Sequence, residues 1–407
     1  MICSELTTFL QKVLDKRELI YDPQAERASE IEELIQTIER MYEKIEPFHI
    51  LLRIRLSREL DFTYIEDFHD GWAVAEKEHG ESVMMVNVEG DIMRGEEGNV
   101  LEFYDADQFS EGVAAVRPQK GLELRFLKTD STFIDGNFGM EQSDLDQYRF
   151  SFGLGVACSP GSKTPKYINM HGKFGLELNK KTSYASRFTP DGYATFIHRP
   201  STSTSQDMLL GFVDPNGEIL QTEDGGEFFD EIREFSDGYA WVKIKSWDGQ
   251  IWWRIIDTGG CYQRDKHNQI IGIEEGMTVS KFHNGWAKIK INNTNKTFYL
   301  NPKGEYLKDE TGGKMFWRIA HDFSEGYAVV REDDWQIIDI HGQYLRDDNH
   351  EIIKLHNPGD GFVNGLLAEH IPVQDGPDPW NNHIEIIHMD CEGKFHRFGN
   401  NQSLKHN

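Results

Sequence analysis

The residue types best suited to catalysis in this sequence are acids that recur at one position of a repeated motif. Glu111, Asp237 and Glu325 each precede a glycine in closely similar local sequences. Glycoside hydrolases use two carboxylates roughly 5–10 Å apart as acid, base or nucleophile. Because these acids occur once per repeat, a repeat architecture would keep them well separated. We therefore interpret them as turn residues and predict that the protein is not an enzyme.

Three short segments share part of a known binding motif. Residues 161–164 end in Lys-Thr like a phosphate-binding loop, but Ser162 replaces the glycine that should precede the lysine. Residues 388–396 contain two histidines and a cysteine, and two ligands on one hairpin rarely hold a metal ion. Residues 347–351 are rich in Asp and Asn but lack the loop glycine of a calcium site. We predict no catalytic residue, no cofactor and no metal.

The overall charge limits the classes of partner. The 407 residues include 69 acidic and 43 basic side chains, which gives a formal net charge of -26. Nucleic acids and anionic membranes attract positively charged surfaces, so direct binding to either is not expected. This acidic protein is compatible with high solubility, or with a protein partner that has a basic surface. Aromatic residues make up 12% of the chain, which is too many for a disordered acidic chain.

The cysteines and the N-terminal residues predict a cytoplasmic location. Cys3, Cys158, Cys261 and Cys391 are far apart and form no Cys-x-x-Cys pair, so we expect reduced thiols rather than a disulfide framework or a zinc site. The first residues lack the basic and apolar regions of a signal peptide. No apolar run approaches the length of a transmembrane helix. We therefore predict a cytoplasmic protein that does not bind membranes.

A motif of the type Phe-Ser-Glu-Gly-Tyr-Ala-Val organises most of the chain, and its best copy runs from Phe323 to Val330. Eight copies are recognisable by their glycines, which are Gly71, Gly112, Gly153, Gly192, Gly238, Gly285, Gly326 and Gly365. Successive glycines are 41, 41, 39, 46, 47, 41 and 39 residues apart. A fixed period over eight copies is typical of a repeat architecture. We number the repeats one to eight by these glycines.

A short strand is expected after the motif glycine. An aromatic residue directly follows this glycine in five copies, at Trp72, Tyr193, Tyr239, Trp286 and Tyr327. Residues 327–330 are apolar at every position, although a half-exposed strand would alternate apolar with polar residues. We therefore expect sheets that are covered on both faces. The small residue that comes next, such as Ala328, indicates crowding, and we expect the aromatic residue to fill the gap between adjacent sheets.

A second recurring element follows each strand. It consists of two apolar residues, an Asp or Asn, and a Gly a few positions later, as in residues 337–342. The Asp or Asn side chain can accept bonds from backbone N–H groups two residues on, and Gly supplies the positive φ that closes such a turn. Repeat two lacks the glycine and has Lys128-Thr129-Asp130-Ser131 instead. Each repeat is therefore expected to form a meander of at least three short strands.

Two architectures can stack small sheets of this size, an eight-bladed β-propeller and an open β-solenoid of hairpins. A solenoid needs polar repeats at its ends. The first repeat is apolar at Trp72 and Val74, and the last retains Leu366, Leu367 and Ile371. Because neither end repeat is polar, we predict the closed eight-bladed β-propeller and keep the solenoid as the alternative.

Residues 1–60 differ from the repeats and predict α-helices. Ile31, Leu34, Ile35 and Ile38 recur at helical spacing, and Pro47 ends that stripe. We interpret the segment as a small helical element packed on the main body, with a docking or dimerisation helix pair as the alternative. The predicted domains are a helical element at 1–60, eight β repeats at 61–399 and a disordered tail at 400–407.

The repeat resembles the WG-repeat family. The resemblance rests on the strand entry of the Phe-Ser-Glu-Gly-Tyr-Ala-Val type and on the hairpin of the Ile-Ile-Asp-x-x-Gly type, and it covers residues 61–399. Repeat three departs from the pattern at Phe152 and Leu154, repeat two near Ser131, and repeat eight at Leu366. The resemblance implies a bacterial repeat protein of the binding type, and it supplies no catalytic residues.

Insertions and loops carry the specificity of a repeat protein. Trp247 in repeat five and Trp380 in repeat eight lie in long polar segments, and an exposed loop tryptophan is a typical hot spot for protein binding. For Trp380 the alternative is a side chain folded back on the edge of its sheet. We expect a noncatalytic protein-binding or scaffold module in a multi-protein or regulatory complex, acting through propeller loops and the N-terminal helices. The alternatives are a ligand- or glycan-binding propeller or propeller enzyme that uses the central channel, and a target or regulatory subunit of an effector such as a protease.

Overall fold

The structure, a computed structural model, describes residues 62–396 with internal gaps, together with Leu56 and Leu60. The chain divides into two units, Met1–Leu52 and Arg53–Asn407, and every described residue belongs to the second. Leu56 and Leu60 have helical backbone, and the rest of the predicted helical element at 1–60 lies outside the described residues, as does the tail at 400–407. No helix within the described residues is long and apolar enough to cross a membrane.

The motif copies that the structure describes form tight turns, as predicted. In repeat seven, Ser324 and Tyr327 exchange backbone hydrogen bonds across Glu325 and Gly326, whose φ angles are 53° and 84°. Positive φ at both central residues gives a turn whose twist matches that of the flanking strands. The acid position has φ between 50° and 55° in six repeats, at Asp70, Glu111, Phe152, Asp237, Asn284 and Glu325.

The second recurring element is also a turn. The Asp339 carboxylate accepts backbone N–H bonds from the residues two and four positions on, at 2.9 and 2.8 Å. The same pair of bonds forms at Asn87, Asn169, Asp214, Asp257 and Asn301. In repeat two, Ser131 takes the glycine position at φ 66°, and Asp130 accepts the N–H of Thr132 instead. The predicted turn chemistry is therefore confirmed, including the exception.

The strands of the first four repeats form four small sheets. Repeat one contains β1 (Phe62–Ile65), β2 (Trp72–Lys77), β3 (Val83–Asn87) and β4 (Glu102–Phe103). Repeat two contains β5 (Asp105–Ala106), β6 (Val113–Arg117) and β7 (Arg125–Lys128). Repeat three contains the short 3₁₀-helix η1 (Leu145–Tyr148), β8 (Leu154–Cys158), β9 (Pro165–Asn169) and β10 (Phe174–Glu177). Repeat four contains β11 (Thr182–Ala185), β12 (Ala194–His198) and β13 (Leu209–Val213).

The last four repeats form four further sheets. Repeat five contains β14 (Glu231–Ile232), β15 (Tyr239–Lys245), β16 (Ile251–Asp257) and β17 (Gly272–Glu274). Repeat six contains β18 (Met277–His283), β19 (Trp286–Ile291) and β20 (Lys296–Leu300). Repeat seven contains β21 (Ile319–Ala320), β22 (Tyr327–Arg331) and β23 (Trp335–Asp339). Repeat eight contains β24 (Leu366–Gln374), β25 (Asn382–Asp390) and β26 (Phe395–His396).

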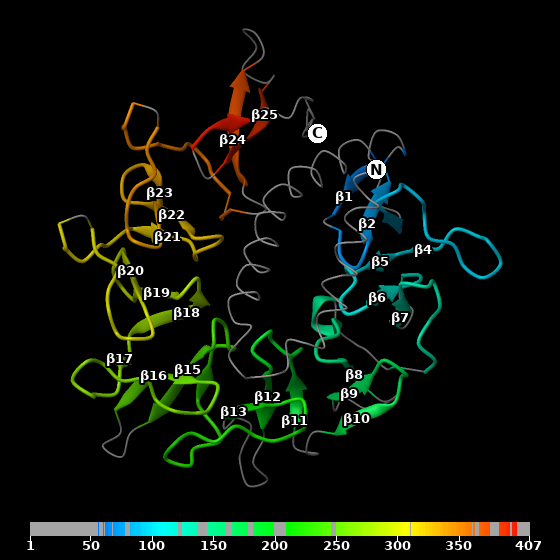
Figure 1. Cartoon of the computed structure of the whole chain (residues 1–407), viewed down its shortest axis with the longest axis horizontal. Helices are drawn as coiled ribbons and strands as arrows, with labels where there is room; N and C mark the ends of the chain where they lie inside the picture. The colour runs from blue at the N-terminus through cyan, green and yellow to red at the C-terminus, as the bar shows by residue number, and fades with distance from the viewer. Residues whose placement is uncertain are drawn as a thin grey trace, which may run out of the picture. The chain divides into compact units, whose positions relative to one another are not determined.

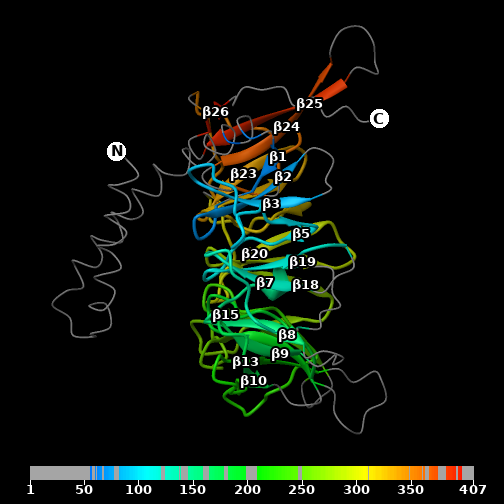
Figure 2. The same ribbon diagram turned by 90° about the vertical axis from the view of Figure 1, so that its right-hand side faces the viewer.

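The sheets are antiparallel meanders that succeed one another in chain order. Neighbouring strands pair in sequence order within each sheet, as in β14-β15-β16-β17. Figure 1 shows the sheets following one another from β1 to β25, and in Figure 2 the strands β3, β5, β7 and β8 lie one below another. Contacts join consecutive sheets, for example β15 with β18 and β20 with β21. A succession of small antiparallel sheets of this kind is a propeller-like all-β fold.

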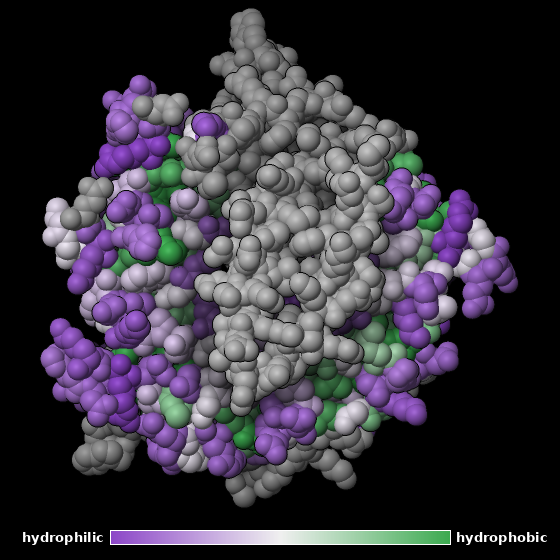
Figure 3. Space-filling model, in the orientation of Figure 1, coloured by the Kyte–Doolittle hydropathy of each residue, from purple (hydrophilic) through white to green (hydrophobic). Residues whose placement is uncertain are grey.

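Both faces of these sheets are covered, as the apolar strands predicted. Ala328, Val329 and Val330 of β22 are fully buried. A side-chain carbon added to Gly155, which takes the small-residue position in repeat three, would lie 2.5 Å from the Phe150 ring. The other small residues are at most 1% exposed, at Ala73, Ala114, Ala194, Ala240 and Ala287. On the face shown in Figure 3 the coloured outer loops are mostly hydrophilic, and hydrophobic residues form small separate areas.

Candidate functional site

We call the boundary between one repeat and the next a seam. Residues at the motif acid position accept hydrogen bonds across these seams. Asp237 accepts a hydrogen bond from the backbone N–H of Gly285 in the following repeat at 2.7 Å. A buried or half-buried backbone N–H needs a partner, and here the previous repeat supplies it. The same bond, at 2.7–3.1 Å, joins Asp70 to Gly112, Glu111 to Gly153, Asp191 to Gly238, and Asn284 to Gly326. The sequence assigned these acids to turns but did not reveal that they link the repeats.

The seam between repeats three and four differs because repeat three has no acid. Phe152 occupies the acid position with a φ of 54°, and its side chain is 48% exposed. The Phe152 ring lies 6.4 Å from the Phe188 ring of the next repeat. An aromatic contact therefore stands where other seams have a hydrogen bond. The last seam involves Gly365, which lies outside the described residues.

The aromatic residue after the motif glycine also crosses the seam. The Tyr193 ring lies 4.8 Å from the Phe235 ring of the next repeat, and its hydroxyl donates to the carbonyl of Thr258 at 2.8 Å. The Trp286 indole N–H likewise donates to the carbonyl of Ile340 at 3.1 Å. Ring contacts of the same kind occur at Tyr239 and Tyr327. These contacts confirm that the aromatic residue fills the gap between adjacent sheets.

In some seams the turn glycine of one repeat lies against the backbone of the repeat before it. A side-chain carbon added to Gly260 would lie 2.0 Å from the carbonyl oxygen of Gln221, and one added to Gly342 would lie 2.3 Å from that of Lys308. In both cases the carbonyl belongs to the residue seven positions after the Asp or Asn of the earlier turn. Only glycine permits so close an approach, so at these two turns the backbones of neighbouring repeats are in direct contact.

The seam between repeats one and two lacks this glycine and contains a cavity. Ser131 occupies the position of Gly260 and Gly342, and the corresponding residue of the preceding repeat is Arg94. A cavity of about 550 Å³ opens here, lined by Trp72, Gly90, Asp91, Ile92, Met93, Arg94, Thr129, Asp130 and Ser131. A serine Cβ would fill the space that glycine leaves to a neighbouring carbonyl at Gly260 and Gly342, and the cavity lies beside this serine. We call the cavity the seam pocket.

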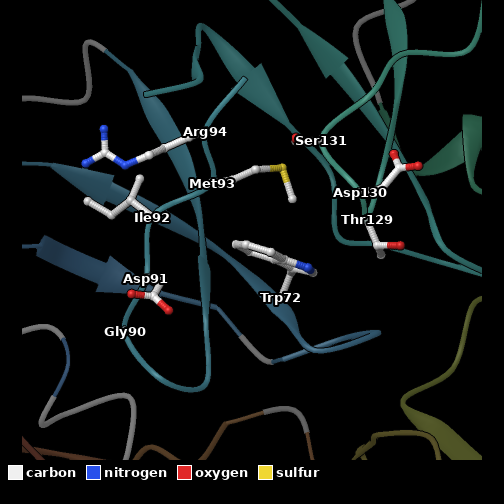
Figure 4. Close-up of a pocket in the computed structure, with 9 residues that line it drawn as sticks. All are labelled: Trp72, Gly90, Asp91, Ile92, Met93, Arg94, Thr129, Asp130 and Ser131. Carbon is white, nitrogen blue, oxygen red and sulfur yellow. The ribbon is translucent and has the colours of Figure 1, made fainter. Parts of the chain in front are cut away.

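The seam pocket combines an apolar wall with a polar rim. Figure 4 shows the Trp72 ring beside Met93, with Thr129 and Asp130 on the far side of the opening. Met93 is 2% exposed and Trp72 is half-buried, so both are held firmly. Hydrogen bonds from Thr132 hold the pKa of the Asp130 carboxyl below its ordinary value, which keeps the rim negatively charged there. The ionisable side chains of the described lining are Asp91, Arg94 and Asp130.

A second cavity of about 490 Å³ lies between repeats four and five. At its polar centre, Asp224 accepts hydrogen bonds from the Thr222 hydroxyl at 2.6 Å and the Tyr262 hydroxyl at 3.2 Å. Burial opposes ionisation of Asp224, but these bonds outweigh it and lower its pKa, while burial raises the pKa of Tyr262. Lys243 in the same wall donates to Glu231 at 2.7 Å. The seam pocket instead places a polar rim beside the Trp72 ring, at the position where the turn glycine is missing, so we take it as the candidate binding site.

The structure reports on only some of the residues that the sequence singled out. Trp247, Trp380 and the segment 161–164 lie outside the described residues. His388 and His396 are register partners in β25 and β26, and the described part of the chain contains no group of three or more side chains able to hold a metal ion. The seam pocket was missed, although the absent turn glycine at Ser131 was a visible signal for it.

The fold is similar to that of several solved structures. A crystal structure of a eukaryotic initiation factor matches with a TM-score of 0.50 and 10% identity, covering 81% of this chain and 85% of that chain. AztD from Citrobacter koseri matches with a TM-score of 0.34 and 12% identity over 78% of this chain and 90% of that chain. Hsv2 from Kluyvelomyces marxianus matches with a TM-score of 0.34 and 10% identity over 78% and 94%. No curated protein sequence matches the chain.

The initiation-factor likeness concerns the fold alone, whereas a family model matches part of the sequence itself. The matched residues are 229–246, which include β14, the motif glycine Gly238 and all of β15. These are the elements on which the resemblance to the WG-repeat family rests. The chain therefore contains a WG containing repeat at residues 229–246.

Proposed function

We propose that the protein is a noncatalytic protein-binding module built on a closed ring of eight propeller blades. Support for the ring comes from the regular attachment of each repeat to the next, through the motif acid and the turn glycine. Closing the ring would pair the first repeat with the last and leave no uncovered end sheet, whereas an open solenoid of hairpins exposes two.

The observation that carries the binding function is the open seam at Ser131. In the described seams, the polar groups that the repeats share are engaged in contacts between repeats, so they are not available for chemistry. Repeat two has Ser131 where other repeats have the turn glycine, and a cavity of about 550 Å³ lies beside it. Protein ligand sites are typically concave and combine apolar surface with polar groups that fix orientation, and the seam pocket places Trp72 and Met93 beside a polar rim.

The seam pocket suits one large side chain from a partner protein. The Trp72 ring and Met93 would contact the apolar part of that side chain, and the hydroxyls of Thr129 and Ser131 would bond its polar end. Tryptophan contributes strongly to binding because it offers a large rigid surface and one N–H donor. In two other seams the aromatic side chain at this position, Tyr193 or Trp286, donates a hydrogen bond to a turn carbonyl of the next repeat. At Trp72 a backbone carbonyl of the partner would accept that hydrogen bond instead.

Site-specific photo-crosslinking tests this proposal with a matched control. Ile92 lines the seam pocket, and Ile219 holds the equivalent place in repeat four, where Gly260 lies directly against the Gln221 carbonyl. We expect a photo-reactive phenylalanine at Ile92 to give one discrete crosslinked protein in the cells that make this chain, and the same residue at Ile219 to give none. Equal crosslinking at both positions would contradict the site. Cleavage or covalent change of the partner on incubation would contradict the noncatalytic role.

A further inference from the structure

Repeat six carries an unusual outer face on the paired segment after its turn. Lys308 pairs with Lys314 there, and residues alternate between the interior and the outside as in any strand. Leu307 and Met315 point inward and are 3% and 7% exposed, whereas Tyr306 and Phe316 are each 40% exposed. Lys296, Tyr306, Lys314 and Phe316 lie on the outside, over the buried Phe298 ring, and we call these five residues the lysine–aromatic face.

Lys314 departs from the pattern of repeats one, five and seven. In those repeats its pairing position is aliphatic and faces a basic residue, as in Arg94 with Val100, Arg264 with Ile270, and Arg346 with Ile352. In repeat six two lysines face each other instead. Like charges directly opposite in a sheet are unfavourable, so a lysine at this position brings a cost that an aliphatic residue avoids.

Three aromatic rings surround the Lys314 ammonium. Its Nζ atom lies 3.3 Å from the ring centre of Tyr306, 3.9 Å from that of Phe298 and 4.9 Å from that of Phe316. The Lys296 Nζ atom lies 5.5 Å from the centre of Phe316, so both ammonium groups share one ring. Each such contact attracts the cation to the ring face and restricts its side chain. The two positive charges are therefore fixed in place at the surface.

The two ammonium groups have no acidic counterpart among the described residues. Neighbouring lysines of repeat six do have one: Lys281 pairs with Glu234 at 2.5 Å, and Lys288 with Asp322 at 3.1 Å. Burial lowers the pKa of Lys314, as expected for an ammonium that loses water without gaining a carboxylate. An external anion would supply the negative charge that these two ammonium groups lack.

We propose that the lysine–aromatic face binds a short acidic segment of a protein partner. The rings already hold the ammonium groups in position. Binding of a carboxylate therefore costs little further side-chain entropy. Tyr306 and Phe316 supply exposed apolar area for the residues beside the acids. A short peptide suits the face better than a nucleic acid, because a long phosphate backbone would extend onto the surface of a chain with net charge -26.

Fluorescence anisotropy with a labelled peptide of eight glutamates tests the proposal. The variants are Lys314→Gln and Lys296→Gln, and the matched control is Lys303→Gln, which changes the net charge equally on an exposed lysine of the same repeat. We expect the peptide to bind the wild-type protein and to lose affinity about fivefold per variant, with little change for the control. A variant that keeps both lysines, Tyr306→Leu, should weaken binding less.

Three results would overturn the inference: no binding of the glutamate peptide, equal weakening by Lys303→Gln, or tighter binding of an eight-nucleotide oligothymidine. The inference deepens the proposed function by naming a partner class, but it uses none of the residues of the seam pocket. Peptide binding without any crosslinked partner at Ile92 would reject the proposed function alone. A crosslinked partner without peptide binding would reject this inference alone.

Discussion

Replacing Gly260 by alanine tests whether the turn glycines set the spacing between repeats. The alanine Cβ would lie 2.0 Å from the carbonyl oxygen of Gln221 and 3.0 Å from its carbonyl carbon. Real Cβ atoms do not approach other heavy atoms below 3.0 Å, and a backbone carbonyl cannot rotate away as a side chain can. The variant must therefore push repeats four and five apart along their seam.

Gly225 provides the matched control for this substitution. Its φ is 83°, against 77° at Gly260, so alanine is similarly strained at both positions. A Cβ at Gly225, however, meets nothing within 4 Å. We expect Gly225→Ala to lower the free energy of unfolding by about 1–2 kcal/mol through left-handed backbone alone. Gly260→Ala should lose a further 1–3 kcal/mol or so, the typical effect of forcing atoms into a packed site.

Urea unfolding of the two variants and the wild type, followed by tryptophan fluorescence, measures the difference. Equal losses of unfolding free energy would mean that Gly260 serves only its own φ angle and does not set the distance between the two repeats. Ser131→Gly completes the test in the opposite direction. Ser131 has a φ of 66°, which glycine adopts without the steric strain of a side chain. The substitution should therefore stabilise the protein by roughly 0.5–1 kcal/mol.

Three other perturbations test individual contacts. Asp237→Ala removes the bond to the Gly285 N–H and should lower the unfolding free energy by about 1–2 kcal/mol, whereas Asp237→Asn keeps an acceptor and should lose less than half as much in the same urea experiment. Trp241 is fully buried with an unpaired indole N–H, so Trp241→Phe should leave the unfolding free energy within about 1 kcal/mol of wild type, because losing an unsatisfied donor offsets losing ring area. Hydrogen bonds from Thr311 and Gly313 lower the pKa of Asp309. The stability that Asp309 contributes is therefore present above its unfolded pKa and lost as the pH falls through its folded pKa. The thermal midpoint of Asp309→Asn should fall less than that of wild type on acidification from pH 6 to pH 3.

The turns and the covered sheets could be predicted because they depend on local sequence. A pair such as Glu325-Gly326 defines a hairpin by backbone preference alone, and an apolar run such as 327–330 requires cover on both faces. Both features are confirmed. The period of the glycines gave the number of repeats, and the described residues contain one sheet for each.

Contacts between repeats could not be read from the sequence. The link from Asp237 to Gly285 depends on how far apart two turns lie, and the local motif does not encode that distance. The seam pocket illustrates the same limit. The missing glycine at Ser131 was visible, but its meaning depends on the backbone carbonyl that glycine approaches in other seams. The lysine–aromatic face was missed because its rings and lysines come from separate strands that only folding brings together.

The affinity of the partner captured at Ile92 for pocket-filling variants tests the central claim most directly. Thr129→Trp fills the seam pocket, and Thr258→Trp places the same side chain at the equivalent, exposed position of repeat five. Isothermal titration calorimetry with the purified partner should show a loss of roughly tenfold or more for Thr129→Trp, as for a blocked hot spot, and little change for Thr258→Trp. Unchanged affinity of Thr129→Trp, or equal losses in both variants, would contradict a binding site at this seam.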